Sequence, residues 1–190
     1  MSQAKTLSES EIREVLDFVS KKKYAARDRA LLLTSHYSGM RVGEIAFLTV
    51  GHVLDATGNI KGEIRLTAEQ TKGKHPRTVF VSSKLKEELA KYVQLIRTDD
   101  KERALFPTQK NPRNGFTPNT LTQHMRELYL AAGLEGCSSH SGRRTYATTI
   151  SSAGVGIRVL MRLMGHRNIS TTAVYIDAND NMLRNAVELA

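Results

Sequence analysis

Residues 140–167 read HSGRRTYATTISSAGVGIRVLMRLMGHR, and this stretch decides how the last third of the chain folds. Its hydrophobic residues recur at helical spacing, which predicts a helix over about 141–152 that stops at Gly154. A shorter helix is expected over 157–164, and Gly165 ends it because glycine tolerates the left-handed backbone of a helix C-terminus. The polar groups that flank these helices therefore stand at helix ends.

The start of the chain also has helical spacing. Ser8 and Glu11 form a capping-box pattern, so the first helix is expected to begin near Glu9. A second helix is expected over about 25–36, with its end at the Ser-Gly pair of 38–39. Both helices have apolar residues to bury against the rest of the chain.

Residues 50–82 follow a different pattern. β-Branched and alternating runs at 64–67 and 77–81, separated by a basic turn, predict two strands. Helical spacing returns over 85–96 and after the Thr-Pro pair at 117–118. These patterns predict an α+β fold that is mainly α-helical with a small antiparallel β-sheet.

The composition indicates a globular protein with excess positive charge. The 190 residues suffice for one compact domain, and 28 Lys and Arg against 19 Asp and Glu give a net charge of +9. That charge favours a polyanionic partner such as nucleic acid, and a solvated basic surface explains it equally well. With Cys137 as the single cysteine and no apolar run near the ~20 residues of a membrane helix, a cytoplasmic protein without membrane contact is expected.

Two arginines, two histidines and a tyrosine form a set that suits phosphoryl transfer. Arg41 and Arg143 carry forked guanidiniums that match the non-bridging oxygens of a phosphodiester. Tyr175 needs a base to act as a nucleophile because a phenol has a pKa of about 10, and His140 or His166 can accept its proton. Each also has an ordinary structural explanation: a surface arginine, a histidine capping a helix end, or a core tyrosine.

The neighbours of these residues add further expectations. His140 and Arg143 are three positions apart and share one helical face, whereas Arg144 is expected to face another way. Glu44 is expected to pair with Arg41 or to orient it. The sequence contains no Walker loop, H-E-x-x-H or acidic metal cluster, so chemistry without a metal or other cofactor is expected.

Five segments together resemble the tyrosine recombinase (phage integrase) family in residue type, order and spacing. They are SGMRVGE at 38–44, TKGK at 71–74, HSGR at 140–143, MGH at 164–166, and Tyr175. Each segment is weak evidence alone, and the combination is specific. The resemblance covers the chain from about residue 8 onward and implies the fold of the family's catalytic domain.

The resemblance implies a role for each residue of the set. Tyr175 would attack a DNA phosphodiester and form a 3′-phosphotyrosine, leaving a free 5′-hydroxyl without metal or ATP. Arg41 and Arg143 would hold the scissile phosphate. His140 would be the general base, and His166 would hydrogen-bond the phosphate.

Further residues enter through the same resemblance. Lys72 matches the general acid that protonates the leaving 5′-oxygen, with Lys74 as the alternative, and Glu44 matches a supporting acidic position. The family often has histidine where this chain has an arginine at position 144. The arginines expected to contact DNA phosphates, with solvated surface as the alternative, are Arg144, Arg158, Arg162 and Arg167.

The resemblance also implies an assembly on double-stranded DNA. Residues 1–190 are expected to be one catalytic domain, with a tail at 1–8 and no N-terminal core-binding domain, so either an excised domain or a compact single-domain member is expected. Residues 181–190 have amphipathic spacing and would dock on a neighbouring protomer. A monomer in solution, a tetramer on DNA and weak, salt-sensitive binding are expected.

Three functions are compatible with these observations. The leading one is a site-specific recombinase of the integrase or invertase type that exchanges DNA strands. The second is a nicking and resealing enzyme similar to type IB topoisomerases, which shares the phosphotyrosine chemistry and lacks partner exchange. The third is a non-catalytic DNA-binding regulator.

Overall fold

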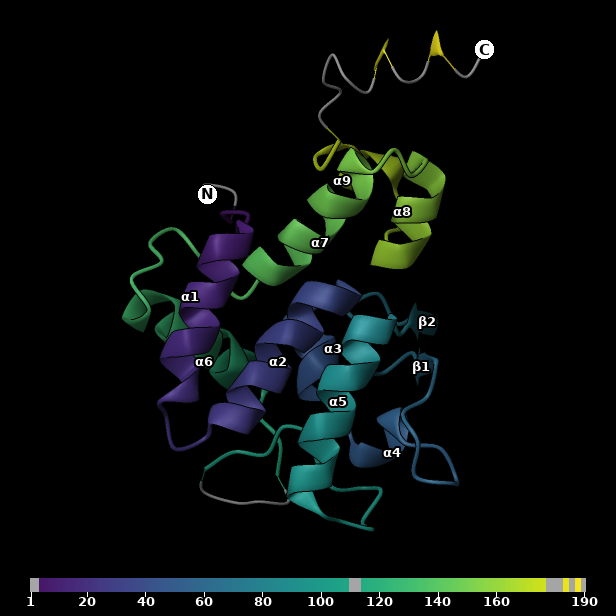
Figure 1. Ribbon diagram of the computed structural model, residues 1–190. Coiled ribbons are helices and arrows are strands. Elements are labelled where there is room, and N and C mark those ends of the chain that lie inside the picture. The colour runs from purple at the N-terminus through teal and green to yellow at the C-terminus, as the bar shows by residue number, and fades with distance from the viewer. Residues whose placement is uncertain (1–3, 110–113, 177–182, 185–186, 189–190) are drawn as a thin grey trace.

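Helices dominate the computed structural model, which describes residues 4–109, 114–176, 183–184 and 187–188 (Figure 1). The helices are α1 (Glu9–Ser20), α2 (Ala25–Ser38), α3 (Val42–Ala46), α4 (Val50–Val53), α5 (Ser83–Ile96), α6 (Pro118–Ala131), α7 (Ser141–Ser152), α8 (Ile157–Met164) and α9 (Ile169–Ala173). The strands β1 (Glu63–Leu66) and β2 (Arg77–Phe80) form an antiparallel pair. The predicted α+β fold is confirmed, whereas the short helix α4 was not predicted.

Local signals place the first two helices. The side chain of Ser8 accepts a hydrogen bond from the Glu11 amide, and the Glu11 carboxylate accepts one from the Ser8 amide at 2.9 Å, so α1 begins at Glu9 as predicted. Helix α2 ends at Ser38, at the Ser-Gly pair where its end was predicted, and Gly39 caps it with a left-handed φ of 60°. This glycine turns the chain directly into the segment that carries Arg41.

Helix α2 is the centre of the main hydrophobic core. It packs against α1, α5 and α7, and Leu31 and Leu32 are buried within the core. From α6, Leu121 and Met125 are buried in the same core, as their spacing predicts. Burying one such side chain contributes about 1.5–3 kcal/mol. Helix α2 is therefore a firm support for the segments that leave its C-terminus.

A second, smaller hydrophobic cluster holds the end of the described chain. Ala147 of α7 and Leu160 and Met164 of α8 are fully buried in it, and Tyr175 and Ile176 pack against them. In Figure 1, α7, α8 and α9 lie together in the upper part of the view. The position of Tyr175 therefore depends on how α7 and α8 pack.

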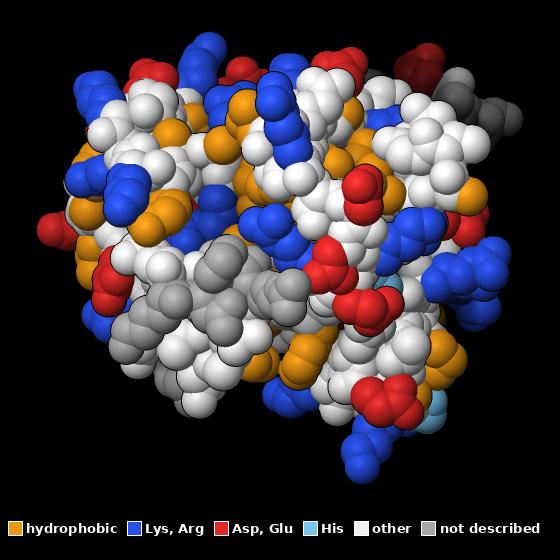
Figure 2. Space-filling view, turned by 90° about the horizontal axis from the view of Figure 1, so that it is seen from below, with side chains coloured by type: hydrophobic (Ala, Val, Ile, Leu, Met, Phe, Trp, Pro, Cys, Tyr) orange, Lys and Arg blue, Asp and Glu red, His pale blue; other side chains and the backbone are white. Residues whose placement is uncertain are grey.

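Charged side chains of both signs occur on the surface. Figure 2 shows that the face seen from below carries acidic and basic side chains interspersed, with hydrophobic ones between them. None of the helices in the described ranges is long and apolar enough to cross a membrane.

The helix expected at 181–190 falls mostly outside the described residues, because 181–182, 185–186 and 189–190 are not described.

Candidate active site

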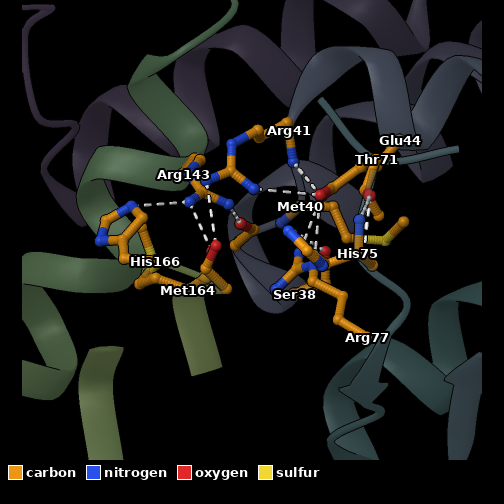
Figure 3. A network of polar contacts seen from close by, with 12 residues as sticks. Ser38, Met40, Arg41, Glu44, Thr71, His75, Arg77, Arg143, Met164 and His166 are labelled. Atoms are coloured by element: carbon orange, nitrogen blue, oxygen red, sulfur yellow. Dashed lines mark hydrogen bonds and ion pairs between the residues drawn. The ribbon is translucent and has the colours of Figure 1, made fainter. Parts of the chain in front are cut away.

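The predicted site residues come from segments that are distant in sequence and meet beside the ends of α7 and α8 (Figure 3). Arg41 occupies the N-cap position of α3, and Arg143 lies in the first turn of α7. His166 follows Gly165, the left-handed residue that ends α8. The structure brings these side chains into one hydrogen-bonded network, which the sequence alone could not show.

Arg143 is the buried centre of this network, with 4% of its surface exposed. Its Nη1 donates to the carbonyl oxygen of Gly39, and its Nη2 donates to the carbonyl oxygen of Met164 at 2.6 Å. Burial, together with the nearby charges of Arg41 and Arg77, lowers the pKa of Arg143 to about 9. The guanidinium therefore remains charged at neutral pH.

Arg41 and Glu44 form the local pair that their spacing predicts. The Glu44 carboxylate accepts a hydrogen bond from the Arg41 amide at 2.7 Å and one from Arg41 Nη1 at 3.2 Å. Arg41 Nη2 donates to the carbonyl oxygen of Gly165 at 3.2 Å. The Arg41 side chain keeps 28% of its surface exposed, whereas that of Glu44 keeps 1%. Glu44 thus holds Arg41 at the edge of an open surface.

Arg77 is a member of the network that sequence reasoning missed. Its Nε and Nη2 contact the two Glu44 carboxylate oxygens at 3.2 and 2.7 Å, and its Nη1 donates to the carbonyl oxygen of Leu163 at 2.8 Å. The sequence offers one weak signal, a basic residue opening a strand directly after the basic turn at 71–76. Its partner Glu44 lies 33 positions upstream, so the pairing depends on the fold.

His166 joins Arg143 to α9. Its Nε2 lies 2.9 Å from Arg143 Nη2, and its Nδ1 lies 2.9 Å from the hydroxyl of Thr172. Burial, followed by the charges of Arg143, Arg41 and Arg77, lowers the pKa of His166 to about 4. At neutral pH the ring is therefore neutral, and it accepts a hydrogen bond from Arg143 through Nε2.

Tyr175 is half-buried beside His166. The two rings stack with centroids 6.0 Å apart and an interplanar angle of 17°. The guanidinium carbon of Arg144 lies 5.9 Å from the centroid of the Tyr175 ring. The sequence did not predict this contact between Arg144 and Tyr175, because Arg144 was expected to face away from His140 and Arg143.

His140 and Lys72 lie on the solvent side of the network, and both side chains are exposed. The pKa of His140 is lowered by partial desolvation and by the positive charges of Arg143, Lys72 and Arg41. Lys72 also lines the groove described next, together with Arg41. Lys74 is also exposed and has a left-handed φ of 51°, which is unusual for a residue with a side chain.

An open groove of about 1270 Å³ passes between the β1–β2 hairpin and the α8–α9 segment. The basic residues that line it are Arg41, Arg65, Lys72, Arg77, Arg162 and Arg167. Arg158 lines a neighbouring depression together with Arg162 and Arg167. Glu63 is also among the residues that line the groove, so the six Lys and Arg side chains give the groove an excess of positive charge, which attracts a polyanion. Within the described residues, no group of three or more His, Cys, Asp or Glu side chains is placed to hold a metal ion.

The chain is similar in sequence to known tyrosine recombinases. The tyrosine recombinase XerA of Pyrococcus furiosus is 28% identical over 186 residues, which cover 98% of this chain and 62% of the relative. A tyrosine recombinase of Pseudothermotoga lettingae is 31% identical over 172 residues, which cover 90% of this chain and 55% of the relative. This chain therefore spans somewhat more than half the length of these relatives.

Solved structures share the fold. The crystal structure of XerA recombinase superposes with a TM-score of 0.74 at 26% identity and covers 100% of this chain and 64% of that one. A lambda integrase dimer bound to a COC′ core site superposes with a TM-score of 0.69 at 16% identity and covers 95% and 62% of the two chains, which supports the fold alone. Residues 5–182 match the phage integrase family over nearly the whole chain, and the chain therefore belongs to that family.

Proposed function

We propose that this chain is the catalytic domain of a site-specific DNA recombinase that cuts and rejoins strands through Tyr175. The observation that carries the proposal is the position of His166, which contacts both Arg143 and Tyr175 and lines the basic groove together with Arg41. Two guanidiniums next to a phenol are what attack on a phosphodiester requires. The relatives named tyrosine recombinases support the same activity.

In the proposed reaction, the phenolic oxygen of Tyr175 attacks phosphorus and the bond from phosphorus to the 5′-oxygen breaks. His140 takes the phenolic proton, and Lys72 protonates the leaving 5′-oxygen. Arg41 and Arg143 stabilise the charge that develops on the non-bridging oxygens. The product is a 3′-phosphotyrosine, and attack by a 5′-hydroxyl reverses the steps and joins a new strand.

The lining of the groove favours Lys72 over Lys74 as the general acid. Lys72 lines the groove with Arg41, and its charge acts on His140. Lys74 belongs to the same turn without lining the groove. Supporting contacts to DNA phosphates are assigned to the exposed arginines beside the groove, which are Arg158, Arg162 and Arg167.

His166 requires a rearrangement in this scheme. Its Nε2 accepts a hydrogen bond from Arg143, so it cannot donate to a phosphate in the present geometry. A phosphate that binds Arg143 would compete with His166 for the guanidinium. The Nε2 atom of His166 could then donate a hydrogen bond to the phosphate only in the other tautomer or in the protonated ring. We infer that substrate binding and a change at His166 are coupled.

Assembly on DNA is proposed on the resemblance and on related structures. XerH recombinase was solved on its difH substrate, with a TM-score of 0.65 to this chain at 22% identity. We propose a monomer in solution, a tetramer on DNA and docking of residues 181–190 on a neighbouring protomer. Deleting 181–190 is then expected to weaken assembly on DNA while the fold is retained.

A covalent-trapping experiment tests the proposed activity. The wild-type protein is incubated with nicked, end-labelled duplexes from the DNA that flanks its own gene, and adducts are resolved on denaturing gels. An adduct is expected for the wild type and for the distant control Tyr24→Phe, and none for Tyr175→Phe. Adducts retained by Tyr175→Phe would refute the assigned nucleophile. Binding without any adduct would favour a regulator, and adducts without partner exchange would favour a topoisomerase-like enzyme.

A further inference from the structure

Glu44 is a buried carboxylate placed directly beside the arginine proposed to bind the scissile phosphate. Its side chain is 1% exposed, and both of its oxygens contact Arg41 and Arg77. A carboxylate and a phosphate are both anions that an arginine fork binds well. Glu44 is therefore a potential competitor of the substrate for Arg41.

The two arginines hold Glu44 in different ways. Arg77 has a partner for each of its three guanidinium nitrogens, and its contacts to Glu44 Oε2 and to the carbonyl of Leu163 are 2.7 and 2.8 Å long. The side-chain contacts of Arg41 are both 3.2 Å long, one to Glu44 and one to Gly165. Arg77 is thus fixed, whereas Arg41 is held loosely.

Exposure and packing also distinguish the fixed Arg77 from the loosely held Arg41. The side chain of Arg77 is 10% exposed, compared with 28% for Arg41. A Cβ atom added to Gly165 would lie 2.6 Å from Cδ of Arg77, so the chain at the end of α8 fits closely around the Arg77 stem. Figure 3 shows Arg77 and Arg41 reaching Glu44 from different directions.

We propose that Arg77 is a positioning residue that neutralises Glu44 and so leaves the charge of Arg41 available to the scissile phosphate. The proposal rests on the proposed function of this site and deepens it. Of the charged partners of Glu44 among the described residues, Arg41 is the one that remains if Arg77 is removed. Without Arg77, Arg41 would have to leave a buried, unpaired carboxylate in order to bind DNA, which is unfavourable.

If Arg77 neutralises the charge of Glu44, a second substitution at Glu44 should restore anion binding, which is not expected if Arg77 only fills space. Replacing Arg77 by glutamine leaves Glu44 unneutralised, so binding of an anion at Arg41 should weaken. Replacing Glu44 by glutamine in the same protein removes the unneutralised charge, so anion binding should recover. If Arg77 only filled space, the second substitution would add damage or change nothing.

The first test uses inorganic phosphate as the probe, so it does not require a known DNA site. Phosphate is titrated into the full chain while the Nε–Hε NMR signals of the arginines are followed. Arg77→Gln is expected to weaken phosphate binding about tenfold, and Glu44→Gln with Arg77→Gln is expected to return within about threefold of wild type. Arg77→Lys keeps the charge and is expected to bind within about threefold of wild type. Arg29→Gln, which breaks the exposed pair with Glu88, is the matched control and should leave binding unchanged.

The second test measures cleavage on a duplex that traps the wild-type protein. Arg77→Gln is expected to lower the single-turnover rate about tenfold or more at saturating DNA, with partial recovery in the double variant. Equal defects in Arg77→Gln, Arg77→Lys and the double variant would overturn the proposal, and so would normal phosphate binding by Arg77→Gln. If Arg77→Gln does not fold, Arg77→Lys and the double variant still provide the test: activity near the wild type is expected for Arg77→Lys, and equal defects in both would overturn the proposal. A wild-type protein that binds phosphate in this pattern and traps no DNA would refute the proposed function and retain the role of Arg77.

Discussion

Nη2 of Arg143 lies 2.9 Å from Nε2 of His166, and this contact fixes the protonation state of the histidine. Arginine has no acceptor, so Nε2 must be unprotonated. The proton then resides on Nδ1, which is 2.9 Å from the hydroxyl of Thr172. Burial disfavours the protonated ring, and protonation would also place two positive groups in contact, so both effects lower the pKa of His166.

The first prediction is an acid-dependent loss of stability through His166. Its pKa falls from an ordinary 6.5 to about 4 on folding, so the unfolded chain binds the proton more tightly. Neutral His166 therefore makes its full contribution to the free energy of unfolding above about pH 6.5, and this contribution is lost as the pH falls towards 4. After discounting for solvent screening, the loss between pH 7 and pH 5 should be roughly 1 kcal/mol.

Urea unfolding at the two pH values measures this effect in the wild type and in His166→Gln. Glutamine retains an acceptor for Arg143 and does not titrate, so the variant should lose less stability between pH 7 and pH 5. Equal losses in the two proteins, or an NMR titration of His166 near pH 6.5, would contradict the assignment.

The second prediction concerns the structural role of Arg143. Its guanidinium is buried and binds two carbonyl oxygens as well as His166. Arg143→Ala should therefore lower the free energy of unfolding by about 2–4 kcal/mol, because buried acceptors lose their donor. Arg13 is exposed on α1, and Arg13→Ala should change stability by less than about 0.5 kcal/mol. Urea midpoints for both variants provide the measurement, and equal midpoints would reject a structural contribution from Arg143.

The elements that could be predicted from sequence are those with local signals. The capping box of Ser8 and Glu11 set the start of α1, and the left-handed glycines at 39 and 165 set the ends of α2 and α8. Such signals act within one helical turn, so they do not require knowledge of the fold. The two strands were likewise found from their alternation.

The features that escaped prediction depend on long-range contacts. Arg77 meets Glu44 across 33 positions and Leu163 across 86, and nothing near Arg77 in the sequence identifies either partner. Arg144 was assigned a direction from helical spacing, but its long side chain reaches back to Tyr175. Side-chain length and tertiary packing therefore determine which partners the arginines of the site contact.

The third prediction contrasts two helical glycines, Gly142 and Gly43, which lie in the segments that resemble the family. A Cβ on Gly142 would lie 2.6 Å from the hydroxyl oxygen of Ser35 and 3.2 Å from a backbone nitrogen of α2, so this glycine permits the close contact of α7 and α2. A Cβ on Gly43 would meet Pro118 at 3.9 Å, an ordinary contact. Gly142→Ala should therefore destabilise the fold by about 1–3 kcal/mol.

Gly43→Ala is the matched control for that prediction. It should stabilise the fold by about 0.5–1 kcal/mol because alanine favours the helix over the unfolded chain. Thermal and urea unfolding of the two variants should shift in opposite directions. A shift of the same sign would indicate that α2 and α7 can separate at low cost, contrary to the packing described above.

The fourth prediction concerns Arg144 and the nucleophile candidate. A guanidinium 5.9 Å from the Tyr175 ring centroid forms a cation–π contact, which contributes about 0.5–1 kcal/mol at a partly exposed site. If this contact orients the phenol for attack, Arg144→Ala should slow covalent trapping about 2- to 10-fold at saturating DNA. Arg144→Lys retains the positive charge and should remain closer to the wild type.

The alternative for Arg144 is a contact to the DNA backbone, and salt dependence separates the two roles. A phosphate contact would make Arg144→Ala weaken binding and reduce the slope of log affinity against log salt by about one, with no defect once DNA is saturating. A contact to Tyr175 leaves the salt slope unchanged and retains the defect at saturation. Trapping rates and binding isotherms at several salt concentrations, measured on the same two variants, therefore determine whether this arginine acts on the tyrosine or on the substrate.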